Sequence, residues 1–133
     1  MATSPILAPD IATIETIARA VLARLRQSFG PVLDDIVFRI AEFAEKAVLD
    51  ELNIDDPFAL SGLYTGQPIG EKSLMDSGTL PDIIHLYRRP LLDEWVESGE
   101  SLEALIAHVM IHEVGHHFGL SDEDMHALEA EAE

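Results

Sequence analysis

The sequence predicts a single small domain that mixes helices with short strands. Its 133 residues are enough for one hydrophobic core but not for two, and 47% of them are hydrophobic. Two β-forming stretches, Asp34 to Phe43 and Asp82 to Arg89, stand among segments whose apolar residues recur at helical spacing. We expect residues 1–9, which contain two prolines, to form a flexible tail, and residues 10–133 to form the domain.

The first helix is expected to begin after Asp10 and to end at Gly30 and Pro31. Asp10 is a suitable N-cap, and a glycine followed by a proline interrupts helical structure. Apolar residues recur within this segment at steps of three and four, which predicts one buried face: Ile11, Ile14, Ala18, Val21, Leu25 and Phe29.

The middle of the chain is expected to alternate between regular and irregular structure. A strand over Asp34 to Phe43 is followed by a short helix from about Ala44 to Leu52. Residues 54–81 contain four glycines and three prolines, which predicts a loop that either forms a lid or binding wall or is simply mobile. The second strand, Ile83 to Tyr87, is followed by Pro90 and is therefore expected at the edge of the sheet.

Two further helices are predicted before an acidic C-terminal segment. The first covers Leu91 to Glu97 and should end near Gly99. Ser101 is the expected N-cap of the next helix, Leu102 to Phe118, which is apolar almost all round and therefore predicted to be central and buried. A short helix is expected within Glu123 to Glu133.

This buried helix carries the pattern His-Glu-x-x-His, at His112, Glu113 and His116. Residues four apart lie about 40° from each other around a helix, so the two imidazoles can bind one metal ion. Glu113 lies about 100° from His112, where it can reach a metal-bound water without being a ligand. Gly119 allows the helix to end and the chain to turn back, which brings Asp122 towards the histidines. Three such ligands leave a fourth position for water, as a catalytic zinc site requires.

The composition narrows the possible partners. The chain has 25 acidic and 8 basic residues, a formal net charge of −17, so we expect no nucleic acid and no anionic membrane as a partner. The absence of cysteine leaves histidine and carboxylates as the strong metal ligands. Residues 1–9 lack the features of a signal peptide, and no apolar run could span a bilayer. A cytoplasmic protein is expected, with a monomer as the default.

With these residues in place, the sequence resembles the small bacterial zincin-like proteins described as possible or minimal zinc metallopeptidases. The resemblance rests on the motif H-E-x-x-H-x-x-G-x-x-D, which runs from His112 to Asp122. It continues upstream in Gly62-Leu63-Tyr64, Gly66, Pro68 and the stretch from Leu80 to Pro90, and it covers residues 60–128 approximately.

The resemblance implies a minimal α+β zincin fold, in which a small sheet packs on the central motif-bearing helix and on an N-terminal helix. It also implies one Zn²⁺ per chain, held by His112, His116 and Asp122, with Glu113 as the catalytic general base in the hydrolysis of a peptide or protein. Zincins commonly hold an extended substrate along an edge strand beside the motif helix, and Ile83 to Tyr87 is the candidate strand here.

Two alternatives keep the metal but change the function. One is a non-catalytic module that retains the zincin fold to bind a partner protein, although a purely structural site does not need Glu113. The other is a metal-dependent hydrolase of another substrate such as RNA, against which the charge of −17 and the lack of a basic patch both count.

Other polar residues are candidates for supporting roles. His108, one turn before His112, is a candidate for supporting that ligand, and His85 or Tyr87 for stabilising an oxyanion. The remaining candidates are His117 and His126 near the motif, and Arg88 and Arg89, which either bind a substrate carboxylate or pair with acidic residues.

Overall fold

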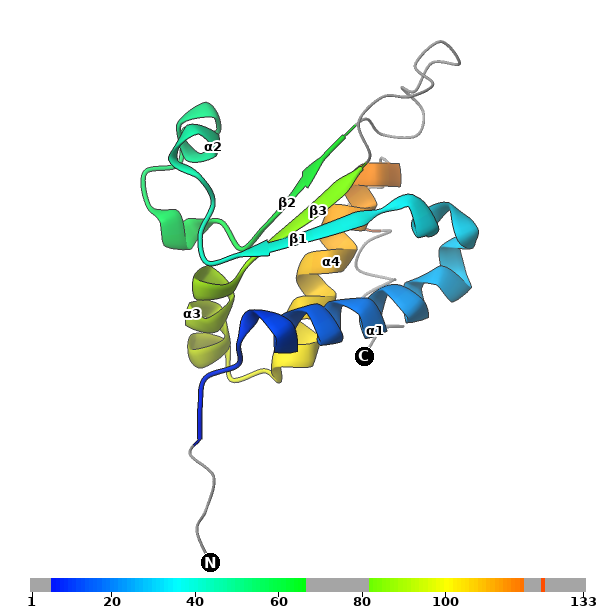
Figure 1. Ribbon diagram of the computed structural model, residues 1–133, viewed down its shortest axis with the longest axis horizontal. Helices are drawn as coiled ribbons and strands as arrows, with labels where there is room; N and C mark the ends of the chain where they lie inside the picture. Colours follow the sequence, from blue (N-terminus) through cyan, green and yellow to red (C-terminus); the bar gives the residue numbers. More distant parts are fainter. Residues whose placement is uncertain (1–5, 67–81, 119–122, 124–133) are drawn as a thin grey trace, which may run out of the picture.

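A three-stranded sheet and four α-helices make up the part of the chain that the computed structural model describes, residues 6–66, 82–118 and 123 (Figure 1). The helices are α1 (Ile11–Phe29), α2 (Lys46–Glu51), α3 (Arg88–Ser98) and α4 (Leu102–Phe118). The strands are β1 (Val37–Ala41), β2 (Gly62–Thr65) and β3 (Ile83–Tyr87). Two short 3-10 helices, η1 (Pro31–Asp35) and η2 (Pro57–Ala59), precede β1 and β2. The predicted α+β class is confirmed.

The sheet has the strand order β1-β3-β2 and is mixed. β1 runs parallel to β3, with Val37 opposite Ile83, and β2 runs antiparallel to β3, with Gly62 opposite Leu86. The central strand is therefore β3, and β2 forms the edge on the side of α4.

The prediction that Ile83–Tyr87 is an edge strand is wrong. Pro90, on which that prediction depended, lies in the first turn of α3, where a backbone N–H has no partner within the helix. The edge strand beside α4 is Gly62–Thr65, inside the segment that was expected to be irregular. That strand has only four residues and begins at a glycine, so it carries too little alternation to be recognised from sequence.

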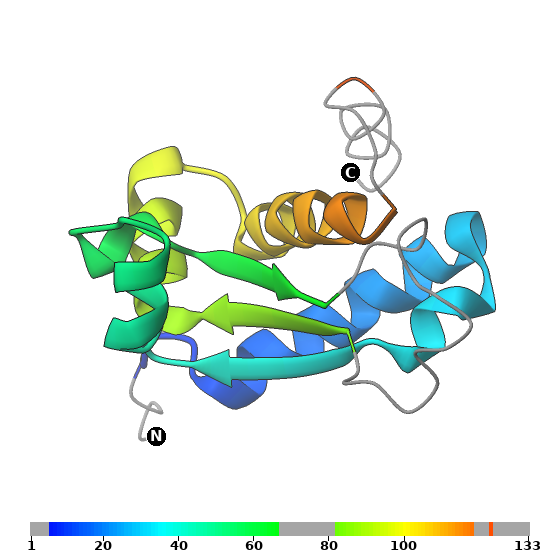
Figure 2. The same ribbon diagram turned by 90° about the horizontal axis from the view of Figure 1, so that it is seen from above.

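One face of the sheet is covered by α1 and α4, which also pack on each other (Figures 1 and 2). The inward-facing residues of β1 and β3 are Phe38, Ile40, Ile84 and Leu86, and they pack in one cluster with the buried residues of both helices. A small sheet on the motif-bearing helix and an N-terminal helix is the arrangement that the family resemblance implied.

The N-terminal helix α1 forms as its apolar stripe predicts. Thr13 donates its backbone N–H to the Asp10 side chain at 2.8 Å, which confirms the N-cap. Gly30, with φ of 81°, ends the helix in a conformation that favours glycine. The stripe is buried in its middle and more exposed at its two ends; the buried members are Ile14, Ala18, Val21 and Leu25.

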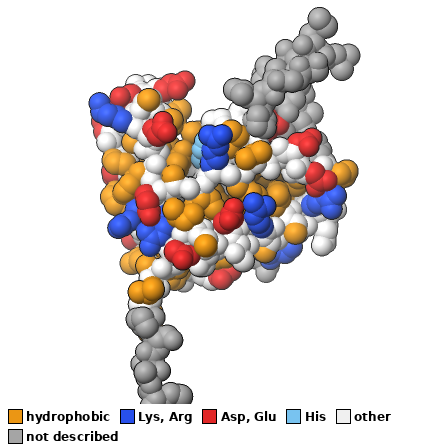
Figure 3. Space-filling model, in the orientation of Figure 1, with side chains coloured by type: hydrophobic (Ala, Val, Ile, Leu, Met, Phe, Trp, Pro, Cys, Tyr) orange, Lys and Arg blue, Asp and Glu red, His pale blue; other side chains and the backbone are white. Residues whose placement is uncertain are grey.

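On the side of the sheet away from α1, α2 lies at the end where β1 and β3 finish (Figures 1 and 2). Tyr87 of β3 packs there with Ala44 and Leu49 in a second, smaller cluster. On the face of the molecule shown in Figure 3, acidic and basic side chains are interspersed rather than gathered by sign. Among the described residues, no helix combines the length and the apolar character needed to cross a membrane.

Candidate metal centre

The helix α4 carries the motif towards its C-terminal end. Ser101 accepts the backbone N–H of Ala104 through its hydroxyl at 3.1 Å, which confirms the predicted N-cap. From this cap the chain is helical through Phe118, so the positions of His112 and His116 are one helical turn apart. Buried residues occur on most sides of this helix, as expected of a central one: Leu102, Leu105, Ile106, Ala107, Val109, Met110, Ile111 and Val114.

A pocket of about 270 Å³ opens beside the motif. His112 and Glu113 both line it, the first half-buried and the second only 9% exposed. The other lining residues come from α4, from α3 and from the segment that leads into β2: His108, Val109, Glu94, Ala59, Leu60, Ser61 and Gly62. The pocket therefore lies where the edge strand begins beside the motif helix.

Glycine at position 62 allows β2 to lie this close to α4. A Cβ built on Gly62 would be 2.6 Å from Cγ1 of Val109 and 3.7 Å from Cγ of Glu113. The first distance is shorter than a real Cβ contact, so any side chain here would push the strand away from the helix. Because residue 62 has no side chain, β2 can pack directly against α4, next to Glu113.

His108 lies beside His112 on the same helix. Their ring centroids are 4.9 Å apart with the planes tilted by 59°, and both side chains line the pocket. A supporting role for His108 requires such a contact, although the His108 side chain is exposed rather than partly buried.

Two of the three predicted zinc ligands lie beyond what the structure describes. The side chain of His116 and the whole of Asp122 are outside the described part of the chain, as are Gly119, His126 and the side chain of His117. Within the described part, no group of three His, Asp or Glu residues could hold a metal ion. His112 and the largely buried Glu113 nevertheless fit a zinc site chemically, because a neutral imidazole is a preferred zinc ligand and a carboxylate beside the cavity can act as a base.

His85 and Tyr87 lie on the face of the sheet away from the helix layer, opposite in direction to the buried Ile84 and Leu86. Their rings stack with centroids 6.2 Å apart, and Nε2 of His85 is 3.1 Å from the Thr65 hydroxyl. Burial lowers the pKa of His85. Burial raises the pKa of Tyr87, to which the negative charges of Glu45 and Glu113 add. Tyr87 thus lies within electrostatic range of Glu113, and the oxyanion-stabilising role suggested for His85 or Tyr87 stays a prediction.

Arg88 and Arg89 pair with an acidic residue of the protein, which is one of the two roles suggested for them. Arg88 donates to the carbonyl of Pro9 at 2.7 Å and to the Glu42 carboxylate at 2.9 Å. Arg89 lies 3.6 Å from the same carboxylate. These arginines join the start of α3 to the end of β1 and to the segment before α1.

Two polar pairs near the site were not anticipated from the sequence. The Ser61 hydroxyl donates a hydrogen bond to Glu94, which ties the start of β2 to α3. The Tyr64 hydroxyl donates to the buried carboxylate of Asp82 at 3.0 Å, and burial together with this bond raises the pKa of Tyr64. Both pairs join residues distant in sequence, so no local pattern reports them.

Comparison with known proteins adds the family. The family model described as "Zincin-like metallopeptidase" matches residues 33–132, which is most of the chain and includes the sheet, α3, α4 and the motif. A comparison with curated proteins gave no significant match. With the resemblance in its motif, its α+β fold and this match, the chain belongs to the zincin-like metallopeptidase family.

Proposed function

We propose that this protein is a zinc-dependent metallopeptidase with one Zn²⁺ per chain, held by His112, His116 and Asp122, and with Glu113 as the general base. The observation that supports this best is the place of His112 and Glu113 on the wall of one pocket. That pocket lies where β2, the edge strand, comes closest to α4.

The burial of Glu113 beside the pocket supports a role for it in proton transfer. Zinc in such a site lowers the pKa of a bound water to about 7 and polarises the substrate carbonyl. The Glu113 carboxylate, largely buried beside the cavity, accepts the proton of the attacking water and delivers it to the leaving amine. His112 presents an imidazole to the same cavity.

The strand of this protein beside which an extended substrate would bind is β2 in this proposal, in place of β3. Among the described strands, β2 pairs with β3 alone, and its other side faces the neighbourhood of α4. An extended peptide added beside Gly62–Thr65 would pass the pocket that contains Glu113. This placement accounts for the need for glycine at position 62, since β2 must stay close to the helix.

We also propose that residues 10–133 act as one domain. The family match begins after α1, yet α1 packs against α4 and shares its hydrophobic core. Removal of α1 would expose the side of α4 that it covers, so the motif helix depends on it.

The test measures metal content and peptide hydrolysis on the same preparations. Wild type purified without a histidine tag should contain about one zinc per chain, and Asp122→Ala should bind zinc more weakly because a ligand is lost. A broad peptide library should be cleaved by the zinc-loaded wild type and not by Glu113→Gln. Cleavage by the Glu113→Gln protein would overturn the proposed role of Glu113, and a wild type that takes up no metal even after reconstitution would overturn the hydrolase.

A further inference from the structure

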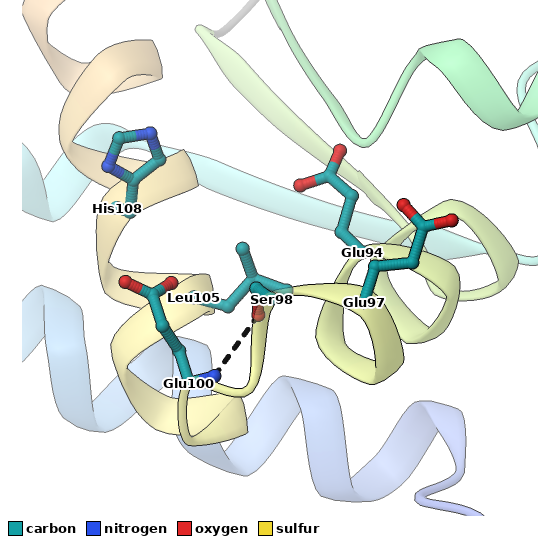
Figure 4. A pocket seen from close by; sticks show the side chains of 6 residues that line it. All are labelled: Glu94, Glu97, Ser98, Glu100, Leu105 and His108. Atoms are coloured by element: carbon teal, nitrogen blue, oxygen red, sulfur yellow. Dashed lines mark hydrogen bonds between the residues drawn. The ribbon is translucent and has the colours of Figure 1, made fainter.

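A second hollow continues the pocket at the motif. Its volume is about 380 Å³, and it is lined by Glu94, Glu97, Ser98, Glu100, Leu105 and His108 (Figure 4). Glu94 and His108 line both hollows, so the two meet at these side chains. Together they form a groove between α3 and α4, called here the α3–α4 groove, which leads from Glu113 to the turn between the two helices.

The α3–α4 groove combines an apolar floor with a negatively charged rim. Leu105 is buried and forms part of the floor, whereas Glu97 and Glu100 are exposed at the rim (Figure 4). None of the residues described as lining either hollow is a lysine or an arginine. A long side chain with an aliphatic stem and a positive end has the complementary chemistry.

Glu94 shares a pocket with the proposed catalytic residues. It is half-buried and lines the same pocket as His112 and Glu113. Its carboxylate accepts a hydrogen bond from Ser61, whose backbone carbonyl in turn accepts the N–H of Tyr87 at 2.9 Å. Glu94 is therefore held in place by the sheet rather than being free to swing into solvent.

We propose that the α3–α4 groove receives a lysine or arginine side chain of the substrate, and that Glu94 selects it. The aliphatic stem would pack on Leu105, and the positive group would form a charge-assisted hydrogen bond with Glu94. Glu97 and Glu100 add attraction that salt screens, because both are exposed. This inference rests on the proposed peptidase function, since it names the class of substrate for that site.

The test compares binding of matched peptides to the zinc-loaded Glu113→Gln protein, which is expected to bind without cleaving. The peptides are N-acetylated and carry one lysine at successive positions of a neutral sequence, each paired with a norleucine peptide of the same length. The norleucine peptides are also measured with a free N-terminal amine. For lysine at one position, we expect binding on the order of tenfold tighter than norleucine at low salt, with the advantage falling as salt rises.

Two further substitutions locate the effect. Glu94→Gln keeps the side-chain shape and a group that can accept from Ser61, and it should remove most of the lysine advantage. Asp93→Asn is the matched control, because it removes the same charge from an exposed neighbouring position of α3 that lines neither hollow. Glu97→Gln should reduce the advantage less than Glu94→Gln does.

Each outcome bears on the inference separately from the peptidase activity. Equal binding of lysine and norleucine peptides, or equal loss in the Glu94 and Asp93 variants, would overturn it, even if the wild type cleaves neutral peptides. A lysine preference that depends on Glu94 supports it, even if no peptide is cleaved. A preference for a free N-terminal amine over its acetylated form, without preference for internal lysine, would overturn the side-chain assignment and give the groove to a peptide N-terminus.

Discussion

Gly62 of β2 packs against Val109 of α4 with no room for a side chain between them: a Cβ added at position 62 would lie 2.6 Å from the Val109 side chain and 3.4 Å from the carbonyl oxygen of His85. The edge strand is thus fitted between its neighbouring strand and the motif helix. Because Glu113 follows Val109 by one helical turn, the same contact sets the distance between the edge strand and the proposed base.

Gly62→Ala should therefore reduce both stability and activity. Overpacking of this kind lowers the free energy of unfolding by about 1–3 kcal/mol, and the displaced strand would hold a substrate less well beside Glu113. Denaturant unfolding and peptide hydrolysis measure the two effects. Adding Val109→Ala removes the atom in the clash and should restore part of both losses, whereas no recovery in the double variant would contradict the proposed contact.

The control for this experiment is Gly30→Ala at the end of α1. Gly30 has φ of 81° with no atom within 4 Å of a built Cβ, so alanine there introduces backbone strain without a clash. We expect a loss of stability of about 1–2 kcal/mol and unchanged hydrolysis at temperatures where the protein stays folded.

Glu113→Gln should abolish turnover while zinc remains bound. The substitution keeps the size of this largely buried side chain, but an amide cannot accept the proton of the attacking water. Loss of the general base should lower kcat by at least about 10²-fold. Glu103→Gln is a suitable control, since Glu103 is exposed in the first turn of the same helix and should leave kcat unchanged.

His112 and His108 should differ sharply in their effect on metal binding. We expect His112→Ala to abolish stoichiometric zinc binding, whereas His108→Ala should retain one zinc with an affinity reduced by about tenfold, because the His108 ring lies against that of the proposed ligand His112. Elemental analysis and a chelator competition measure the two quantities. Zinc lost in His108→Ala but kept in His116→Ala would mean that the ion binds one helical turn earlier than proposed.

The long helices and the local part of the site were predictable from the sequence because their signals are local. The stripe of α1 and its Asp10 cap lie within one segment, and so does the spacing that puts His112 and Glu113 on a buried helix. The α+β class was implied by the family resemblance, which the motif on this helix carries. Periodicity and capping report such features well, because neighbouring residues on one element determine them.

The sheet order and the walls of the pocket were not predictable, because they depend on contacts between distant residues. Pro90 was expected to follow the end of an edge strand, but it lies in the first turn of α3, and the strand before it is the central one. The hydrogen bond between Ser61 and Glu94 joins residues 33 positions apart. A strand as short as Gly62–Thr65 is formed by its neighbours β3 and α4 rather than by its own pattern.

Tyr64→Phe should destabilise the protein near neutral pH. The wild-type hydroxyl donates to Asp82, which is 4% exposed and immediately precedes β3. Removing one donor from a buried carboxylate reduces the free energy of unfolding by about 1–3 kcal/mol. Thermal or denaturant unfolding at pH 7 measures this loss, and an unchanged midpoint would show that the bond contributes nothing to stability.

The same bond should make wild type more sensitive to alkali than Tyr64→Phe. Burial and the Asp82 carboxylate raise the pKa of Tyr64, so the phenol stays protonated in the folded protein at a pH where it ionises in the unfolded chain. The hydrogen bond therefore makes its full contribution to the free energy of unfolding below about pH 10, the pKa of tyrosine in the unfolded chain. Above that pH the contribution is lost progressively. The difference in stability between wild type and Tyr64→Phe should therefore be constant from pH 7 to 9 and shrink above pH 10, within the range where both proteins still fold. Tyr87, whose pKa burial also raises, is present in both proteins, so the change in the difference belongs to Tyr64. A difference that stays constant through pH 11 would contradict a raised pKa for Tyr64.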